Sequence, residues 1–178
     1  MRGVVRSIVF AALALLAWSG ACAAASLTVA SPAFKDGDKM PRAQSCDAGD
    51  HSPPLHVSGI PSEAKTLAIL MTEQGDPKGS VTLWMTANIP AAPEVQIAEN
   101  QPHTRQMKGE GVQLEATGGK LGYRGPCPPQ GVTRQTLVEV FALDTPLDLP
   151  ENATREQFLL AVEGHILARG KLAGKYKR

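Results

Sequence analysis

The stretch GYRGPCPPQG, residues 122–131, contains three glycines, three prolines and one cysteine. Proline lacks a backbone N–H and fixes φ, while glycine opens conformations that other residues avoid. The segment can therefore be neither the interior of a helix nor a central strand. It predicts a stiff loop, which is either a rigid wall beside a ligand or a corner between strands.

Short runs with the patterns of β-strands lie on both sides of this loop. Thr66–Thr72 is apolar throughout, as in a buried strand, and Thr82–Ile89 alternates before a proline. Thr136–Asp144 is rich in β-branched and aromatic residues, and His165–Gly174 alternates again. Several short strands separated by turn residues predict a mainly β fold, a sheet or a sandwich.

One helix is expected near the C-terminus. Asn152 or Thr154 can cap it, and Thr154 with Gln157 matches a capping box. Phe158, Leu159 and Val162 follow at helical spacing, and Gly164 can end the helix. The glycosylation sequon at Asn152 is explained by the same cap.

Residues 1–25 have the layout of a secretory signal peptide. Two arginines precede a short apolar run at residues 8–18, and small residues follow. Cleavage after Ala23 or Ala25 would leave a single domain at residues 26–178 in the periplasm or outside the cell. Two alternatives stay open: lipidation of Cys22, and an N-terminal membrane anchor that is not cut. No later apolar run is long enough to span a membrane.

The charge of the chain is almost balanced. Two of the 18 lysines and arginines lie in the leader, so the rest nearly match the 17 acidic residues. This balance gives no electrostatic reason to expect nucleic acid or an anionic membrane as a partner.

Removal of the leader leaves two cysteines, Cys46 and Cys127. In an exported protein this number predicts one disulfide, with two separate thiols as the alternative. The bond would close a loop of about 80 residues, which the chain-entropy model values at about 4 kcal/mol.

No constellation for catalysis or metal binding is present in the sequence. None of the four histidines has a second histidine or cysteine at zinc-ligand spacing, and there is no G-x-S-x-G elbow. DAGDH, residues 47–51, could form a polar cluster but is interpreted as a solvated turn. We therefore expect no enzyme, no metal and no cofactor.

Six motifs in register resemble the phosphatidylethanolamine-binding protein family, in particular its bacterial Raf-kinase-inhibitor-like branch. They are SPAFKDG at Ser31, CDAGDHSPPL at Cys46, NIPA at Asn88, GYRGPCPPQG at Gly122, VFALD at Val140 and GHILARGKLAGKY at Gly164. The resemblance implies a large antiparallel sheet packed on a smaller one, with a few peripheral helices. It also implies a binding or regulatory protein that is not an enzyme.

The family carries a small pocket for anions such as the phosphate of a phospholipid head group, and the proline-rich loop forms one wall of it. Here that wall corresponds to Pro128 and Pro129. The family's D-P-D-A-P motif falls on residues 73–77, where Glu73 replaces the first aspartate and Pro77 is kept. The resemblance also hints at a cis bond before Pro77.

Three further pocket positions follow from the same resemblance. The family's His-Trp pair becomes Leu83-Trp84, and its later His-Arg-Tyr becomes Arg134-Gln135-Thr136. Both histidines are therefore lost. Arg134 could replace them as a fork for an oxyanion, or it could pair with Glu73 and fill the site.

Two functional hypotheses follow. The first is a periplasmic or secreted binding protein for a small anion or head group. Its modified pocket consists of Glu73, Pro77, Trp84, Pro128, Pro129, Arg134 and Thr136. The second is a protein-interaction module, such as a kinase or protease inhibitor, that has lost the small ligand. His165, which has a family counterpart, is expected to be a hydrogen-bonded core residue.

Overall fold

The computed structural model describes residues 25–77 and 79–178. The expected signal peptide lies outside the described residues, apart from Ala25. This part of the chain contains eleven strands, one α-helix and one 3₁₀ turn. Their bounds are β1 (Ala25–Ser26), β2 (Thr28–Ala30), η1 (Arg42–Gln44), β3 (Leu55–Ser58), β4 (Thr66–Gln74), β5 (Val81–Pro90), β6 (Glu94–Ile97), β7 (Val112–Gln113), β8 (Glu115–Ala116), β9 (Lys120–Leu121), β10 (Thr133–Leu143), α1 (Arg155–Val162) and β11 (Ile166–Lys177).

The strands form a large sheet, a small sheet and a hairpin. The large sheet has the order β1-β11-β10-β4-β5-β7, and all its pairs are antiparallel except β1 with β11. The small sheet has the order β2-β3-β6, and β8 pairs with β9. All four strands expected from the sequence are present, so the mainly β prediction is confirmed.

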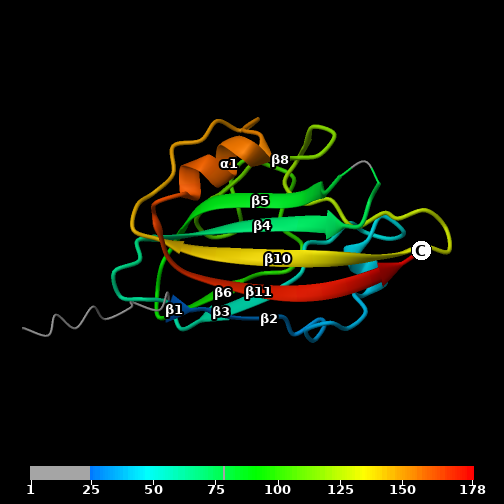
Figure 1. Cartoon of the computed structure of the whole chain (residues 1–178), viewed down its shortest axis with the longest axis horizontal. Helices are drawn as coiled ribbons and strands as arrows, with labels where there is room; N and C mark the ends of the chain where they lie inside the picture. Colours follow the sequence, from blue (N-terminus) through cyan, green and yellow to red (C-terminus); the bar gives the residue numbers. More distant parts are fainter. Residues whose placement is uncertain (1–24, 78) are drawn as a thin grey trace, which may run out of the picture.

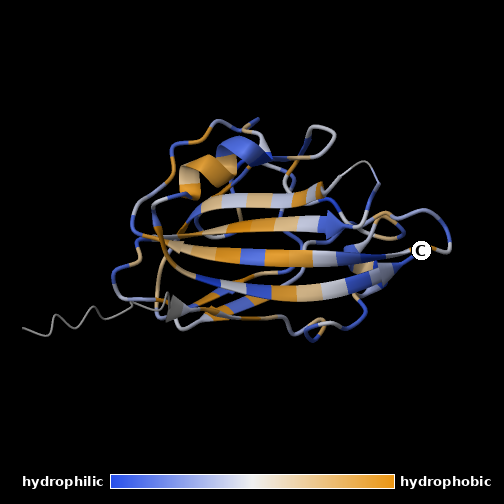
Figure 2. Ribbon diagram, in the orientation of Figure 1, coloured by the Kyte–Doolittle hydropathy of each residue, from blue (hydrophilic) through white to orange (hydrophobic). Residues whose placement is uncertain are grey.

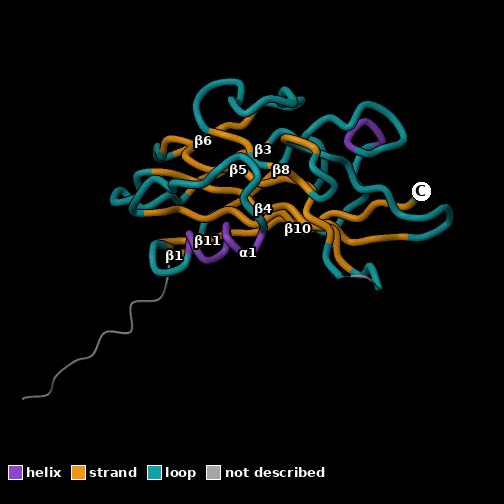
Figure 3. Tube along the Cα trace, turned by 90° about the horizontal axis from the view of Figure 1, so that it is seen from above, coloured by secondary structure: helices purple, strands orange, loops and turns teal. Residues whose placement is uncertain are grey.

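Three layers result from this pairing. The small sheet covers one face of the large sheet and α1 covers the other, as two perpendicular views show (Figures 1 and 3). Because both faces of β4 are covered, eight of its nine residues are buried. This explains why its sequence is apolar throughout and does not alternate.

Helix α1 begins and ends as expected. Thr154 is its N-cap and forms the capping box with Gln157, while Gly164 follows the helix at φ 83°. Phe158 and Val162 are buried against the large sheet. Leu159 was expected to belong to the same face, but it is 41% exposed because it lies one position beyond the buried stripe.

His165 was expected in the core, and this prediction is wrong. Its side chain is 46% exposed, and Nδ1 lies 2.8 Å from Asp144 Oδ1. The residue stands in the turn between α1 and β11, before the strand enters the sheet at Ile166. Its ring is hydrogen-bonded as expected, but at the surface.

Polar residues gather at one end of the large sheet. Figure 2 shows apolar colour along most of β4, mixed apolar and polar colours along β10 and β11, and polar colour at the end of these strands nearest the C-terminus. At this end β4 finishes with Glu73 and Gln74, and β10 begins with Thr133, Arg134 and Gln135. The positions singled out from the sequence therefore share one end of one sheet.

Candidate functional site at the polar strand ends

Three polar residues share one face at this end of the sheet. Thr136 of β10 is paired directly with Glu73 of β4, so their side chains lie on the same side of the sheet. Arg134 precedes Thr136 by two residues and therefore faces the same way. We call Glu73, Arg134, Thr136 and the backbone N–H of Cys127 the strand-end site.

Glu73 is a buried carboxyl, only 4% exposed. It accepts a hydrogen bond from the backbone N–H of Cys127, but Oε2 has no partner among the described residues. Burial raises the pKa of Glu73 above the usual 4.5, while the Cys127 hydrogen bond and the charge of Arg134 oppose this rise. The neutral acid is therefore favoured up to a higher pH than for an exposed glutamate.

Arg134 is mostly engaged by the loop that follows β4. One terminal nitrogen donates a hydrogen bond to the carbonyl oxygen of Gly75, and the other lies 3.9 Å from Asp76 Oδ2. Arg134 forms no ion pair with Glu73 among the described residues. The alternative in which Arg134 pairs with Glu73 is therefore wrong, and Arg134 pairs with Asp76 instead. Arg134 Nε is buried and has no partner in the described part of the chain.

Thr136 completes a group of unpartnered polar atoms. The residue is fully buried, and its Oγ1 has no hydrogen-bond partner among residues 25–77 and 79–178. Buried polar atoms are nearly always hydrogen-bonded, so three such atoms on one face are unusual. The strand-end site thus contains three buried polar atoms, Glu73 Oε2, Arg134 Nε and Thr136 Oγ1, without a partner among the described residues.

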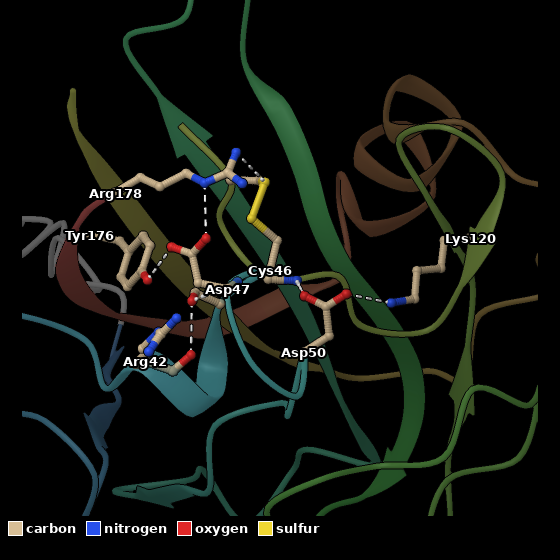
Figure 4. The surroundings of a disulfide bond; sticks show 10 residues. Arg42, Cys46, Asp47, Asp50, Lys120, Tyr176 and Arg178 are labelled. Carbon is tan, nitrogen blue, oxygen red and sulfur yellow. Dashed lines mark hydrogen bonds and ion pairs between the residues drawn. A yellow bond between two sulfur atoms is a disulfide. The ribbon is translucent and has the colours of Figure 1, made fainter. Parts of the chain in front are cut away.

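A disulfide holds the proline-rich loop beside this site. Cys46 and Cys127 are bonded, with their Cα atoms 5.4 Å apart, so the alternative of two free thiols is wrong. Asp50 Oδ1 accepts a hydrogen bond from Gly125 N–H at 2.8 Å, and Asp50 Oδ2 lies 2.7 Å from Lys120 Nζ (Figure 4). These contacts fix the backbone that presents the Cys127 N–H to Glu73.

Comparison with known proteins identifies the family. The model of the family described as phosphatidylethanolamine-binding protein matches residues 30–177. The chain belongs to this family.

Relatives of similar length occur in archaea and bacteria. The chain is 42% identical over 146 residues to a UPF0098 protein of Methanothermobacter thermautotrophicus, which covers 82% of this chain and 95% of that protein. It is 34% identical over 181 residues to UPF0098 protein PYRAB11530 of Pyrococcus abyssi, covering 100% and 99% of the two chains.

Two crystal structures have the same fold. The phosphatidylethanolamine-binding protein homolog CT736 of Chlamydia trachomatis superposes with a TM-score of 0.75 at 31% identity, covering 86% of this chain and 98% of that one. YbcL of E. coli, described as a member of the mammalian phosphatidylethanolamine-binding protein family, gives 0.78 at 22% identity, covering 86% and 99%. The PEBP-like fold expected from the motifs is therefore confirmed.

The two residues at the family's His-Trp position are both core residues here. Leu83, which the resemblance aligns with the family histidine, stands at a shift in register between β4 and β5 and is 1% exposed. Trp84 is fully buried, and its Nε1–H donates to Gln113 Oε1 at 2.8 Å. Its ring meets Tyr123 edge-on at 5.9 Å. Trp84 thus packs the core behind the strand-end site.

The prolines named from the resemblance differ in exposure. Pro128 is buried and Pro129 and Pro77 are exposed. The expected cis bond before Pro77 is wrong, because the described residues contain no cis peptide bond. Gly75 at φ 85° and Gly79 at φ 108° supply the turns that connect β4 to β5.

The roles of the acidic residues beside the disulfide were not predicted from the sequence. The interpretation of residues 47–51 as a solvated turn is wrong for Asp47 and Asp50, whose oxygens bond Tyr176, Arg178, Lys120 and Gly125. Their position next to Cys46 was the available signal, since a disulfide brings its neighbours to the loop at the other end.

The described residues contain no group of three histidine, cysteine or carboxylate side chains placed to hold a metal. None of the described helices is long and apolar enough to cross a membrane.

Proposed function

We infer that the chain is an exported, non-enzymatic binding protein that holds a small oxyanion, such as the phosphate of a head group, at the strand-end site. Membership of the phosphatidylethanolamine-binding protein family supports a binding role. The layout of residues 1–25 supports export.

The observation that carries the proposal is the set of three buried polar atoms without partners, Glu73 Oε2, Arg134 Nε and Thr136 Oγ1. Leaving a buried polar atom unpaired costs about 1–3 kcal/mol, so a ligand that pairs all three gains from each contact. Arg134 Nε and the Thr136 hydroxyl are donors that suit an oxyanion. Glu73 can donate as well while its carboxyl carries a proton, and burial extends this state to higher pH than for an exposed glutamate.

The surroundings of the site reduce the cost of binding. Pro128 is buried beside Cys127, and the disulfide ties this loop to the segment that follows η1. A wall that is already ordered loses little conformational entropy when a ligand arrives. The loss of both family histidines, with Leu83 in place of one, predicts weaker binding than in relatives that keep them.

Titration of the protein comprising residues 26–178 with inorganic phosphate and phosphoethanolamine tests the proposal, with calorimetry and Trp84 fluorescence as readouts. Trp84 is the only tryptophan in this part of the chain. Arg134→Gln should weaken binding about tenfold, the equivalent of one charge-assisted hydrogen bond. Arg169→Gln removes the same charge from an exposed position on β11 and should change nothing. The absence of any response at millimolar ligand contradicts the proposal.

A second candidate is a protein-interaction module that has lost the small ligand. The observation in its favour is that Arg134 already uses its terminal nitrogens on Gly75 and Asp76. In that case neither anion binds, and a tagged protein should retain one defined partner from an extract of the host's export compartment. Added untagged protein should reduce the amount of this partner that is retained. Retention that untagged protein does not reduce contradicts the second candidate.

A further inference from the structure

A polar cavity lies at the end of β11, close to the strand-end site, because Tyr176 in its lining is the cross-strand partner of Arg134. It has a volume of about 560 Å³ and is bordered by the segment at residues 39–42, by the end of β11 and by Gln130. This volume is in the range of small-ligand pockets. We call it the C-terminal cleft, and its lining includes none of Glu73, Arg134 and Thr136.

The side chains of the cleft are strongly basic. Lys39, Arg42, Lys177 and Arg178 line it, and Asp47 is the one acidic side chain among the lining residues. The whole chain carries a net charge of only +1, so this local excess is a feature of the cleft and not of the composition. Concentrated positive charge in a concave site attracts anions.

Asp47 holds one of the four basic side chains, Arg178, in an ion pair. Tyr176 O–H donates to Asp47 Oδ2 at 2.7 Å, and Arg178 Nε donates to Asp47 Oδ1 at 2.9 Å. The hydrogen bond from Tyr176, aided by Arg178, lowers the pKa of Asp47 below its usual 3.8. Figure 4 shows the guanidinium groups of Arg42 and Arg178 on two sides of this carboxylate.

The backbone fixes the positions of Lys39 and Lys177, while their ammonium groups form no ion pair among the described residues. Lys39 forms a bridge with Lys175 of β11, and Met40 N–H donates to Lys175 carbonyl oxygen at 2.8 Å. Met40 is fully buried against Gly174, where an added Cβ would lie 2.6 Å from Met40 Cγ. Within residues 25–77 and 79–178, the ammonium groups of Lys39 and Lys177 make no ion pair.

We propose that the C-terminal cleft is a second anion site, which binds a diphosphate or another ligand with two adjacent anionic groups. The lining supplies four positive side chains, the guanidiniums of Arg42 and Arg178 and the ammoniums of Lys39 and Lys177. A ligand with two linked oxyanions can use more of this charge than a single oxyanion can. Guanidiniums favour bidentate contact with phosphate oxygens, and ammoniums supply point charge.

Calorimetric titration of residues 26–178 with inorganic pyrophosphate at low ionic strength tests this site. The double variant Lys39→Gln/Lys177→Gln should bind at least about tenfold more weakly, since two charge contacts are lost. The matched double variant Lys35→Gln/Lys171→Gln removes two exposed lysines outside the cleft and should bind as the parent does. Equal affinity of the two double variants, or no heat at millimolar pyrophosphate, overturns the proposal.

The variant Arg134→Gln separates this site from the strand-end site. It should keep the binding of pyrophosphate to the C-terminal cleft while it weakens the binding of phosphoethanolamine. Loss of both in this variant means that the cleft is not an independent site, and overturns the proposal.

The two anionic groups can belong to a soluble diphosphate or to lipid head groups at a surface. Co-sedimentation with vesicles of phosphatidylcholine and phosphatidic acid distinguishes these sources. Sedimentation that requires Lys39 and Lys177 assigns the cleft to a lipid surface. Pyrophosphate binding without sedimentation assigns it to a soluble ligand.

Discussion

Glu73 and Thr136 are cross-strand partners in β4 and β10, and each carries a buried oxygen without a hydrogen-bond partner among the described residues. In most proteins such a pair would bond to each other, to water or to the backbone. Here the pair lies beside a loop fixed by a disulfide, and the neighbouring Arg134 Nε is also unpartnered. The geometry therefore concentrates unsatisfied polar atoms at the end of β4 and β10 where we propose that an oxyanion binds.

The first prediction concerns stability and pH. Burial raises the pKa of Glu73, so the folded protein holds this proton at pH values where the unfolded chain, at 4.5, has released it. Stability contributed by Glu73 is therefore fully present below pH 4.5 and is lost as the pH rises through the folded pKa. Glu73→Gln removes this loss, so its free energy of unfolding relative to that of the parent should rise between pH 4.5 and 8.

Urea unfolding across this pH range measures the effect of Glu73→Gln. Asp47 does not interfere, because its pKa is lowered from 3.8 and its contribution is lost only at more acid pH. Glu99→Gln, an exposed change of the same kind, should leave the pH profile unchanged. Parallel profiles for the parent and Glu73→Gln contradict the prediction.

The second prediction concerns anion affinity and pH. Sulfate is fully ionised between pH 5 and 8, because it takes up a proton only in strongly acid solution. Only the protein therefore titrates in this range. Neutral Glu73 can donate to sulfate, whereas ionised Glu73 repels it. Affinity for sulfate at the strand-end site should therefore fall as the pH rises, and Glu73→Gln should bind with little dependence on pH. Stronger binding by the parent at pH 8 than at pH 5 contradicts this expectation.

The third prediction concerns the disulfide. Cys46 and Cys127 are separated by 81 positions, so their bond restricts a long loop in the unfolded chain. Cys46→Ala/Cys127→Ala should lower the free energy of unfolding by about 4 kcal/mol in the chain-entropy model. A reducing agent should bring the parent to the same stability and leave the double variant unaffected. A loss below about 1 kcal/mol, the average cost of a point substitution, shows that the bond contributes little.

The fourth prediction concerns the cap of α1. Thr154 Oγ1 accepts a hydrogen bond from Gln157 N–H at 3.2 Å, and Gln157 Oε1 accepts one from Thr154 N–H at 2.8 Å. Thr154→Ala removes the first bond and should cost about 1 kcal/mol in thermal or urea unfolding. Thr154→Ser keeps the hydroxyl and serves as the control. Equal destabilisation by the two substitutions assigns the effect to the lost methyl group and contradicts a capping role.

The sequence predicted the fold well because its strongest signals are local. Thr66–Thr72 is apolar throughout since β4 is covered on both faces, and the capping box of α1 depends on residues three positions apart. His165 was misplaced because its motif does not reveal where β11 begins. The cis bond before Pro77 was expected from the family motif that falls on residues 73–77. This chain departs from that motif, because position 75 is glycine, and the bond is not cis.

The site was only partly predictable. Alignment with the family named Glu73, Arg134 and Thr136, and the register of β4 with β10 brings these residues together. The partner of Arg134 depends on the path of the loop after β4, and pairing with Asp76 could not be read from residue types. The role of Asp47 depends on a contact with Arg178, 131 positions away in the sequence. Long-range contacts of this kind follow from the fold, and no local pattern encodes them.

The last prediction asks whether the proline-rich loop is a wall with a fixed position. Gly125 lies against backbone, and a Cβ there would stand 2.6 Å from Ser45 Cα and 2.7 Å from Gln44 carbonyl oxygen. Backbone atoms cannot move aside as a flexible side chain can, so Gly125→Ala should cost about 2–3 kcal/mol and displace the Cys127 N–H from Glu73. Gly131→Ala meets nothing within 4 Å and should cost only about 1 kcal/mol for its positive φ. Urea unfolding and sulfate titration of both variants measure the two effects. If the loop can move, Gly125→Ala will be as stable as Gly131→Ala and will bind sulfate equally well, which contradicts a fixed wall.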